Sequence, residues 1–471
     1  MFLLILQRGA GFLTKLVMAN SVTPYEYGII TLVAISIPGM LQIITNLNFF
    51  QILSHSEHGR DYFGFALLSS LVLVSLSSLI LYMFSDEIFA YLNLPPHQSG
   101  LYLTAIVVSM FCISAVLDFQ GVFNGMKLYS APGILEAIPS VARLITVCIL
   151  MGIGVTSVAI YIVVFALSNA IPLLYIAISR YTPALLKSAI TIQIPSKKMF
   201  GFGTAVFIAG NFTNFGQYFN RIVVSHELGV EWQGFYDVSQ TLATSMIFAI
   251  STMVLITVPE ATSLENQVLH ENEGLGGVTR GLFALVLFFA LLLCFFSKFL
   301  VITIFSSDYA PAAEYVYIIA IGYIFFFIQF FLSQVNLSWA KRGREYILLT
   351  VIPLCLIPLI PFVTSYLIAL YRSAGYGNGF IGAYVSFTLF LVLLTILTIL
   401  ICKDLSPIRI LLKKVDRLIL SLALPSLLIC YLRLSPVIGI FLFASMFGIL
   451  IFATGYLRKE LILSMFNKSA G

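Results

Sequence analysis

The stretch KLVMANSVTPYEYG, from Lys15 to Gly28, has a counterpart in RIVVSHELGVEWQG, from Arg221 to Gly234. In each stretch a cation lies near the end of an apolar run, and a polar turn with an acid and an aromatic residue follows. A glycine then stands thirteen residues after the cation. Because the two stretches are 206 residues apart, the pattern predicts one structural unit used twice in the chain.

The composition places this unit in a membrane. Of 471 residues, 60% are hydrophobic and 10% charged, and the mean hydropathy is +1.03. A soluble domain carries about 25% charged residues. Apolar runs of the ~20 residues needed to cross a bilayer recur along the whole length. We therefore expect an all-α integral membrane protein, and the net charge of +5 is no indication of nucleic-acid binding.

The six cysteines lie in or at the ends of apolar runs, and none forms a Cys-x-x-Cys pair. They therefore predict neither a disulfide framework nor a metal site. The five histidines are scattered through predicted loops. We expect no metal and no cofactor.

Hydropathy, turn residues and charges divide the chain into about fourteen transmembrane helices. We expect them near 2–19, 28–53, 62–84, 100–124, 134–154, 158–179, 201–224, 234–258, 280–297, 315–338, 347–369, 379–402, 417–432 and 437–457. Loops after even-numbered helices, with the C-terminal tail, carry eighteen cations, and loops after odd-numbered helices carry three. Since cytoplasmic loops are rich in lysine and arginine, both termini are predicted to be cytoplasmic, in the cell (inner) membrane.

The repeat extends beyond the opening stretches. Gln120 precedes Lys127 by seven residues, and Gln334 precedes Lys341 by seven, at an offset of 214. This predicts two parallel six-helix bundles related by a pseudo-twofold axis, with a C-terminal helix pair appended. The predicted domains are 1–179 and 201–402 for the bundles, 180–200 for a basic cytoplasmic linker, and 403–471 for the last two helices and the tail. Between parallel repeats, substrate sites lie at the repeat interface.

Four cations fall inside predicted spans: Arg8, Lys15, Arg143 and Arg221. Intramembrane charges are costly and usually face the protein interior or a wet cavity, so they are candidate substrate ligands. Arg8 and Arg143 lie near mid-span, and a net positive cavity suits an anionic, phosphate-bearing passenger. Lys15 and Arg221 could instead extend to the nearer interface.

Three acids are candidate charge partners or ion-coupling groups: Asp118, Glu136 and Asp237. Asp118 either pairs with an intramembrane arginine or takes part in ion coupling. Glu136 precedes Arg143 by seven residues on one helix face, so the two could form a structural ion pair. For Asp237 we favour interaction with the N-terminal dipole of the helix near 234–258.

Several segments resemble the polysaccharide-biosynthesis flippases. They are ANSVTPYEYGIITLVAIS and DFQGVFNGMKLYSAPGILEAIPSVARLI in the first half, and the stretch from FGFGTAVFIAG to VPEATSLEN in the second. This family of O-antigen and lipid-linked-oligosaccharide translocases belongs to the multidrug, oligosaccharidyl-lipid and polysaccharide exporter superfamily. The resemblance covers the first twelve helices. It implies a MATE-like fold, with two six-helix bundles in a V around a central cavity and transport by alternating access.

Two features depart from the family's usual pattern. Asn220 precedes Arg221 where members usually have Asp, which argues against an internal salt bridge between these neighbours. Members also usually carry a basic segment before the first helix, whereas Met1 here begins almost inside it.

From the residues and the resemblance we expect a flippase, not an enzyme. Its passenger would be an oligosaccharide or polysaccharide repeat unit on a polyprenyl phosphate or pyrophosphate, moved from the cytoplasmic to the outer leaflet. Membrane lipids, a coupling Na⁺ or H⁺ and glycan-assembly proteins are the other expected partners. A cation-coupled multidrug or metabolite antiporter of the same superfamily is the first alternative. A membrane O-antigen polymerase or ligase is the second, although its usual large outer loop has no counterpart here.

Overall fold

The computed structural model describes residues 2–46, 49–54, 60–128, 130–246, 273–339, 344–402, 405–432 and 435–456. Within these ranges the regular structure is helical and no strand occurs. Each predicted span contains a helix, which confirms the all-α fold class. The predicted end of the eighth helix after 246, the loop up to 272 and the tail from 457 lie outside the described residues.

Contacts divide the chain into two compact units. Unit 1 comprises Met1–Val238, Ile304–Tyr309 and Pro353–Ala383, and unit 2 comprises Ser239–Thr303, Ala310–Ile352 and Tyr384–Gly471. The domain boundaries expected from the sequence, at 180–200 and 403, stay a prediction.

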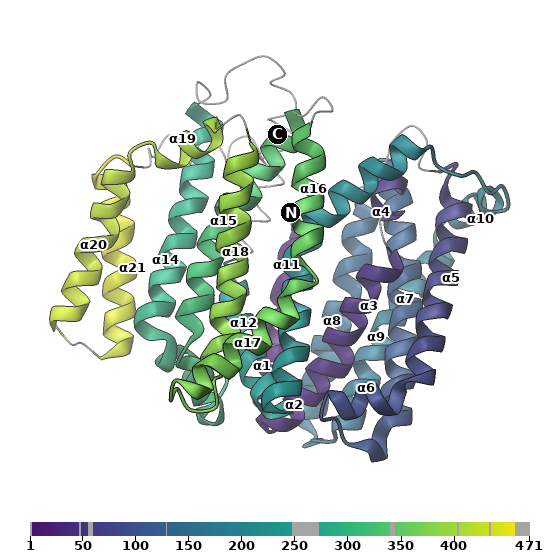
Figure 1. Cartoon of the computed structure of the whole chain (residues 1–471), viewed down its shortest axis with the longest axis horizontal. Coiled ribbons are helices and arrows are strands. Elements are labelled where there is room, and N and C mark those ends of the chain that lie inside the picture. Colours follow the sequence, from purple (N-terminus) through teal and green to yellow (C-terminus); the bar gives the residue numbers. More distant parts are fainter. Residues whose placement is uncertain are drawn as a thin grey trace. The chain divides into compact units, whose positions relative to one another are not determined.

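Unit 1 begins with the elements α1 to α11. They are α1 (Phe2–Ala19), α2 (Pro24–Thr31), η1 (Leu32–Ser36), α3 (Ile37–Asn46), α4 (Phe49–Leu53), α5 (Phe63–Met83), α6 (Ser85–Tyr91), η2 (Pro96–Gln98), α7 (Ser99–Gly125), α8 (Ser130–Gly152), α9 (Val158–Ile178), α10 (Thr182–Ala189) and α11 (Lys197–Leu228). The start of α12 (Val230–Thr244) and α17 (Leu359–Ser373) complete it. Helix α7 packs against α5, α8 and α9, and α1 packs along α8 (Figure 1).

The predicted second helix, near 28–53, is not continuous. It begins earlier, at Pro24, and passes through the π-helical turn η1 before α3. Pro38 has no backbone N–H and cannot complete the regular ladder. The N–H of Ile37 reaches the carbonyl of Leu32 instead, five residues back. The predicted helix near 347–369 is likewise divided, into α16 (Arg344–Leu356) and α17, where Pro358 caps α17.

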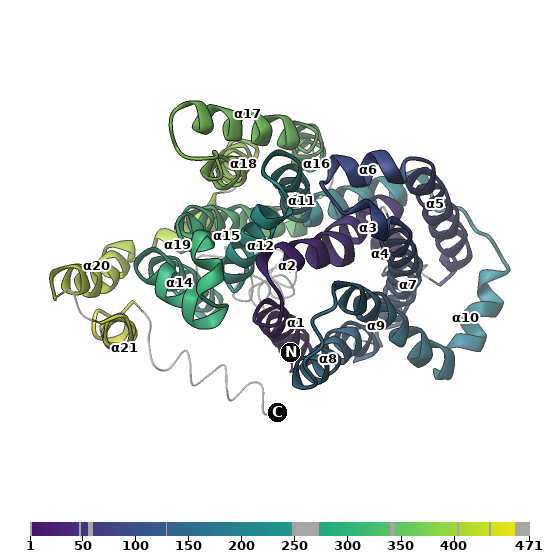
Figure 2. The same ribbon diagram turned by 90° about the horizontal axis from the view of Figure 1, so that it is seen from below.

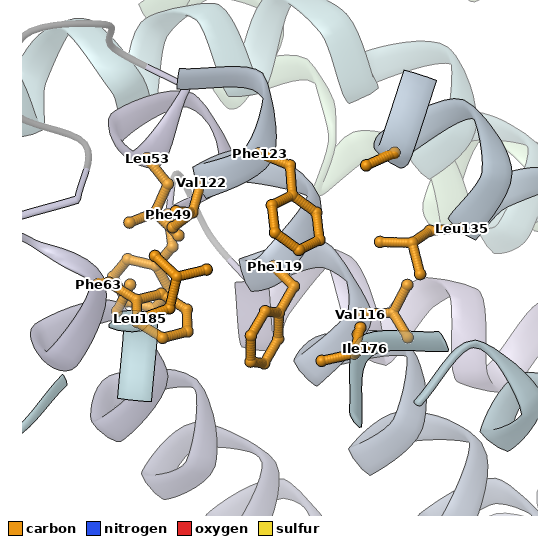
Figure 3. Packing of buried hydrophobic residues seen from close by; sticks show 12 residues of the cluster. Phe49, Leu53, Phe63, Val116, Phe119, Val122, Phe123, Leu135, Ile176 and Leu185 are labelled. Atoms are coloured by element: carbon orange, nitrogen blue, oxygen red, sulfur yellow. The ribbon is translucent and has the colours of Figure 1, made fainter. Parts of the chain in front are cut away.

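An apolar cluster holds one end of the unit 1 bundle together. Figure 3 shows aromatic and aliphatic side chains from α4, α5, α7, α8, α9 and α10 meeting there. Phe63 and Phe119 make an edge-to-face contact with centroids 5.0 Å apart, and Leu185 of α10 is 1% exposed in the same cluster. Such ring geometry adds to the energy of burial alone. The short helix α10 is thereby fixed to the bundle.

Unit 2 contains most of α14 (Glu273–Ile304), α15 (Val316–Trp339), most of α16, most of α18 (Ile381–Ile401), α19 (Ser406–Leu412), α20 (Val415–Leu432) and α21 (Pro436–Ala453). Helices α20 and α21 lie side by side in both views (Figures 1 and 2). Phe443 of α21 stacks on Phe288 of α14 with centroids 5.2 Å apart. The appended helix pair is therefore packed on a repeat helix within this unit.

Ten helical segments of the described residues are long and apolar enough to cross a bilayer. Many large apolar side chains on them are exposed, such as Leu174 at 68% and Phe441 at 75%. Apolar surface of this extent is stable only against lipid or another protein. The chain is a multi-pass membrane protein.

Candidate functional site

Two helical hairpins begin the two repeats, and local sequence sets where each one turns. In the first, the Thr23 hydroxyl accepts the N–H of Glu26 at 3.3 Å, and the Glu26 carboxylate accepts the N–H of Thr23 at 2.9 Å. This capping box, with Pro24 behind it, starts α2. In the second, Gly229 takes φ +99° and separates α11 from α12. A non-glycine residue would be strained there.

The hairpins cross at two glycines. A Cβ atom on Gly28 would lie 2.1 Å from the carbonyl oxygen of Val230, and one on Gly234 would lie 2.3 Å from that of Pro24. Adding 206 to the residue number converts Pro24 to Val230 and Gly28 to Gly234. The two contacts are therefore images of each other, and both glycines are required because backbone meets backbone at this crossing.

Hydrogen bonds across the crossing repeat the same relation. The Tyr27 hydroxyl donates to Asp237 Oδ2 at 2.8 Å, and Gln233 Nε2 donates to Thr31 Oγ1 at 3.2 Å. The offset of 206 maps Tyr27 to Gln233 and Thr31 to Asp237. Equivalent positions of the two hairpins therefore form the hydrogen bonds across the crossing, although the side chains at these positions differ.

The ends of the two opening helices are also held alike. Asn20 Nδ2 at the end of α1 donates to the Ile304 carbonyl at 2.9 Å. Its counterpart at +206, His226, has Nδ1 2.8 Å from the Tyr91 carbonyl oxygen. The second offset, 214, maps Tyr91 to Phe305, one residue from Ile304. The exchange of contacts between repeats thus extends beyond the crossing.

One carboxylate is shared by the cations of both repeats. Lys15 Nζ lies 2.9 Å from Asp237 Oδ2, and Arg221 Nη2 lies 2.5 Å from Asp237 Oδ1. Side-chain exposure is 0% for Asp237, 5% for Arg221 and 19% for Lys15. We call Lys15, Tyr27, Arg221 and Asp237 the crossing cluster. Its charges sum to +1, and its contacts have the short lengths of charge-assisted hydrogen bonds.

An aromatic ring and a neutral hydrogen-bond network lie beside Arg221. The Tyr218 ring lies under it at 5.8 Å, and its buried Nε has no hydrogen-bond partner among the described residues. Asn220 donates to the Tyr236 hydroxyl at 3.2 Å and accepts from the Thr364 hydroxyl at 2.6 Å. The departure from the family pattern at Asn220 therefore leaves a neutral network beside the cluster.

Arg143 binds neutral partners rather than an acid. Its Nε donates to Ser168 Oγ at 2.7 Å, its Nη2 donates to Asn169 Oδ1, and the Phe165 ring lies 5.2 Å from the guanidinium carbon. All three partners belong to α9. The ion pair with Glu136 that sequence spacing allowed is absent from the described contacts, because the guanidinium is directed to the neighbouring helix.

Arg8 lies exposed on α1. No ion pair between it and Glu136 of α8 is found in the described part of the chain. Arg8 and Arg143 thus differ from Lys15 and Arg221: neither forms a described salt bridge, whereas Lys15 and Arg221 share Asp237.

Asp118 stands apart from all four cations. It is fully buried in α7, and Oδ1 accepts a hydrogen bond from Ser70 Oγ of α5 at 3.3 Å. The sequence left open whether it pairs with an arginine, and the described residues contain no such contact.

The sequence of residues 1–259 matches the family described as polysaccharide biosynthesis protein. The chain belongs to this family. Similar folds occur in the lipid II flippase MurJ in an inward closed conformation, with a TM-score of 0.66 and 13% identity over 97% of this chain and 99% of that one. No match was found among curated protein sequences.

Two further solved structures with this fold are MATE family multidrug resistance transporters of the MOP superfamily. An inward-facing one has a TM-score of 0.60 and 11% identity over 86% of this chain and 94% of the other. An outward-facing one has a TM-score of 0.51 and 13% identity over 87% and 98%. Membership of the polysaccharide biosynthesis family and a fold shared with MurJ and MATE proteins confirm the resemblance expected from the sequence.

Sequence reasoning on this family member missed the role of Asp237. We favoured a dipole interaction because the helix was expected to begin at 234, which placed Asp237 in its first turn. The helix begins at Val230, so Glu231 occupies the first turn and Asp237 lies deeper, against both cations. The offset of 206 pairs Asp237 with Thr31, but it carries no signal that the two hairpins cross at these positions.

Proposed function

We propose that the protein is a flippase that moves a polyprenyl phosphate- or pyrophosphate-linked oligosaccharide or polysaccharide repeat unit from the cytoplasmic to the outer leaflet. Its family membership supports a role in polysaccharide biosynthesis. Its fold is shared with a lipid II flippase and with transporters. Alternating access between the two leaflets is the proposed mode of transport.

Two cations without a described salt bridge carry the substrate proposal. The half-buried Arg143 guanidinium is held by neutral partners, so its charge remains available to pair with an anion. Arg8 is exposed on a helix that the composition places in the membrane. Arginine pairs well with phosphate, through two parallel hydrogen bonds. We assign Arg8 and Arg143 as the first ligands of the lipid phosphate or of acidic sugars.

We assign Lys15 and Arg221 a secondary role in substrate binding. Both bind Asp237, so an incoming phosphate must compete with a carboxylate for them. Lys15, at 19% exposure, is the more accessible of the two. We propose that Lys15 contributes to substrate attraction while Arg221 keeps Asp237 in position.

The direction of transport rests on the loop charges. The bias of eighteen loop cations to three supports cytoplasmic termini. A lipid carrier that receives its glycan inside the cell would then enter the protein from the cytoplasmic side. A coupling H⁺ or Na⁺ is part of the proposal.

The test is a leaflet assay in vesicles with a fluorescent polyprenyl pyrophosphate-linked oligosaccharide. The wild-type protein should expose the glycan on the opposite leaflet, and Arg8→Gln/Arg143→Gln should reduce the rate at least tenfold at equal protein amounts. Arg60→Gln, which removes an exposed loop cation, is the matched control and should retain the rate. Efflux of small organic cations without movement of the labelled glycan would favour the antiporter instead.

A further inference from the structure

Asp118 is a buried carboxyl whose hydrogen bonding is incomplete. Its exposure is 0%, and it lies in a helical segment long and apolar enough to span the membrane. Oδ1 accepts a hydrogen bond from Ser70 at 3.3 Å, and Oδ2 has no hydrogen-bond partner among the described residues. Ser114, one turn earlier on α7, also has a buried hydroxyl without a described partner.

Most of the described elements that pack around Asp118 carry no charged residue. Elements η1, α3, α4 and α5 pack against α7 and contain no Asp, Glu, Lys, Arg or His. The titratable groups on all elements packed against α7 are Tyr82 of α5, Tyr161 and Tyr175 of α9, Glu136, Arg143 and Cys148 of α8, Asp86, Glu87 and Tyr91 of α6, and His97 of η2. On α7 itself they are Tyr102 and Cys112.

None of these groups contacts Asp118 in the described structure. Apart from the histidine, Arg143 is the one basic residue in this group, and it is bound to Ser168 and Asn169 of α9. Tyr161 donates its hydroxyl to the Val155 carbonyl at 3.0 Å. Among the described residues the carboxyl therefore has a hydroxyl donor but no counter-charge.

A carboxylate in this setting would be an isolated buried ion. Such an ion costs many kcal/mol in a low-dielectric medium, and the group takes up a proton instead. The length of the hydrogen bond from Ser70 to Asp118 agrees with a protonated carboxyl. Hydroxyl donors approach an ionised carboxylate to about 2.5–2.7 Å, whereas Ser70 stays at 3.3 Å.

We propose that Asp118, with Ser70 as its hydrogen-bond donor, is a proton-binding site of this protein. The carboxyl is the neutral acid in the packed bundle. When a change of conformation admits water between α5 and α7, the O–H bond breaks, the proton passes to water and a carboxylate remains. Proton binding stands on the local structure alone, and only its coupling to glycan movement rests on the proposed function.

The direct test is infrared spectroscopy of the purified full-length protein in lipid vesicles. A protonated carboxylic acid has a carbonyl stretch that a carboxylate lacks. We expect such a band at neutral pH in the wild type, lost in Asp118→Asn and kept in Asp86→Asn, the matched control at an exposed acid. Ser70→Ala should move the band to higher frequency, because the carbonyl loses its hydrogen bond. A wild-type spectrum without a band that depends on Asp118 overturns the proposal.

Coupling is tested separately in the leaflet assay with an imposed pH gradient. The wild type should respond to the gradient, while Asp118→Asn, which imitates the protonated acid, should flip without responding to it. A response to a Na⁺ gradient at constant pH that Asp118→Asn abolishes would overturn the assignment of a proton. If the wild type moves no glycan, the proposed function fails while the infrared result still decides proton binding.

Discussion

Asp237 and Asp118 are the same side chain at the same exposure, 0%, in opposite surroundings. Asp237 receives Lys15, Arg221 and the Tyr27 hydroxyl, at 2.5 to 2.9 Å. Asp118 receives one serine hydroxyl at 3.3 Å. A buried carboxyl with two cations is stable as an ion and joins the helices that supply them. One without a cation is stable as an acid, and its removal disturbs little.

The largest effect is expected from Asp237→Ala. It leaves the buried Arg221 and the half-buried Lys15 facing each other without a counter-charge, and breaking a buried ion pair from one side costs on the order of 3–5 kcal/mol. The free energy of unfolding in detergent, followed by circular dichroism, should fall by that amount. Asp86→Ala, which removes an exposed acid, is the control and should change it little. A variant as stable as the wild type would mean that Asp237 does not hold the crossing together.

The repeat relation predicts that the carboxylate can be moved across the axis. Thr31 is the counterpart of Asp237, and Lys15 and Arg221 are counterparts of each other. A carboxylate at position 31 should therefore reach both cations. Thr31→Asp/Asp237→Thr is expected to recover at least half of the stability lost in Asp237→Thr, measured in the same unfolding experiment. If the double variant recovers no stability, the pseudo-symmetry relates the backbones of the two repeats but not their side-chain contacts.

The two glycines of the crossing should be equally intolerant of a side chain. Gly28→Ala and Gly234→Ala each place a methyl group within about 2 Å of a carbonyl oxygen, so the hairpins must separate. Overpacking of this kind costs about 1–3 kcal/mol. Gly11→Ala is the matched control, since no atom lies within 4 Å of its Cβ position. Markedly unequal losses at Gly28 and Gly234 would contradict the symmetric crossing.

Arg143→Lys should have a moderate effect on transport and a small one on stability. Lysine keeps the charge but lacks the planar fork that binds Ser168 and Asn169 together. We expect the flipping rate to fall several-fold, while the melting temperature stays close to that of the wild type. The leaflet assay measures the first quantity. A wild-type rate would show that charge alone suffices at this position.

The smallest effect is expected from Asp118→Asn. The amide has nearly the shape of the protonated acid, so the free energy of unfolding should change by less than about 1 kcal/mol, as for a net hydrogen bond. In Asp237→Asn both cations lose their counter-charge, so its free energy of unfolding should fall much more. The difference between the losses in these two variants tests most directly whether the two aspartates differ in charge. Equal losses in the two variants would indicate that Asp118 is also ionised.

The sequence predicted the fold well because apolar runs and repeat spacing are local or periodic signals. It placed the spans, and the family match confirms the resemblance. It did not predict that Asp237 joins two repeats, because that depends on the crossing angle of two hairpins distant in sequence. Nor could spacing show that Arg143 turns toward α9 rather than toward Glu136 on its own helix.

The reciprocal crossing also bears on what one chain can encode and two identical chains cannot. Two identical copies of the first repeat would form the same backbone crossing, since Gly28 of each would meet Pro24 of the other. In such a symmetric dimer, two identical cations would lie on either side of the twofold axis. Two threonines would stand at the positions that Thr31 and Asp237 occupy in this chain. Within one chain the two repeats can differ at each position. A single acid can then balance a lysine and an arginine, an arrangement that no exact homodimer can encode.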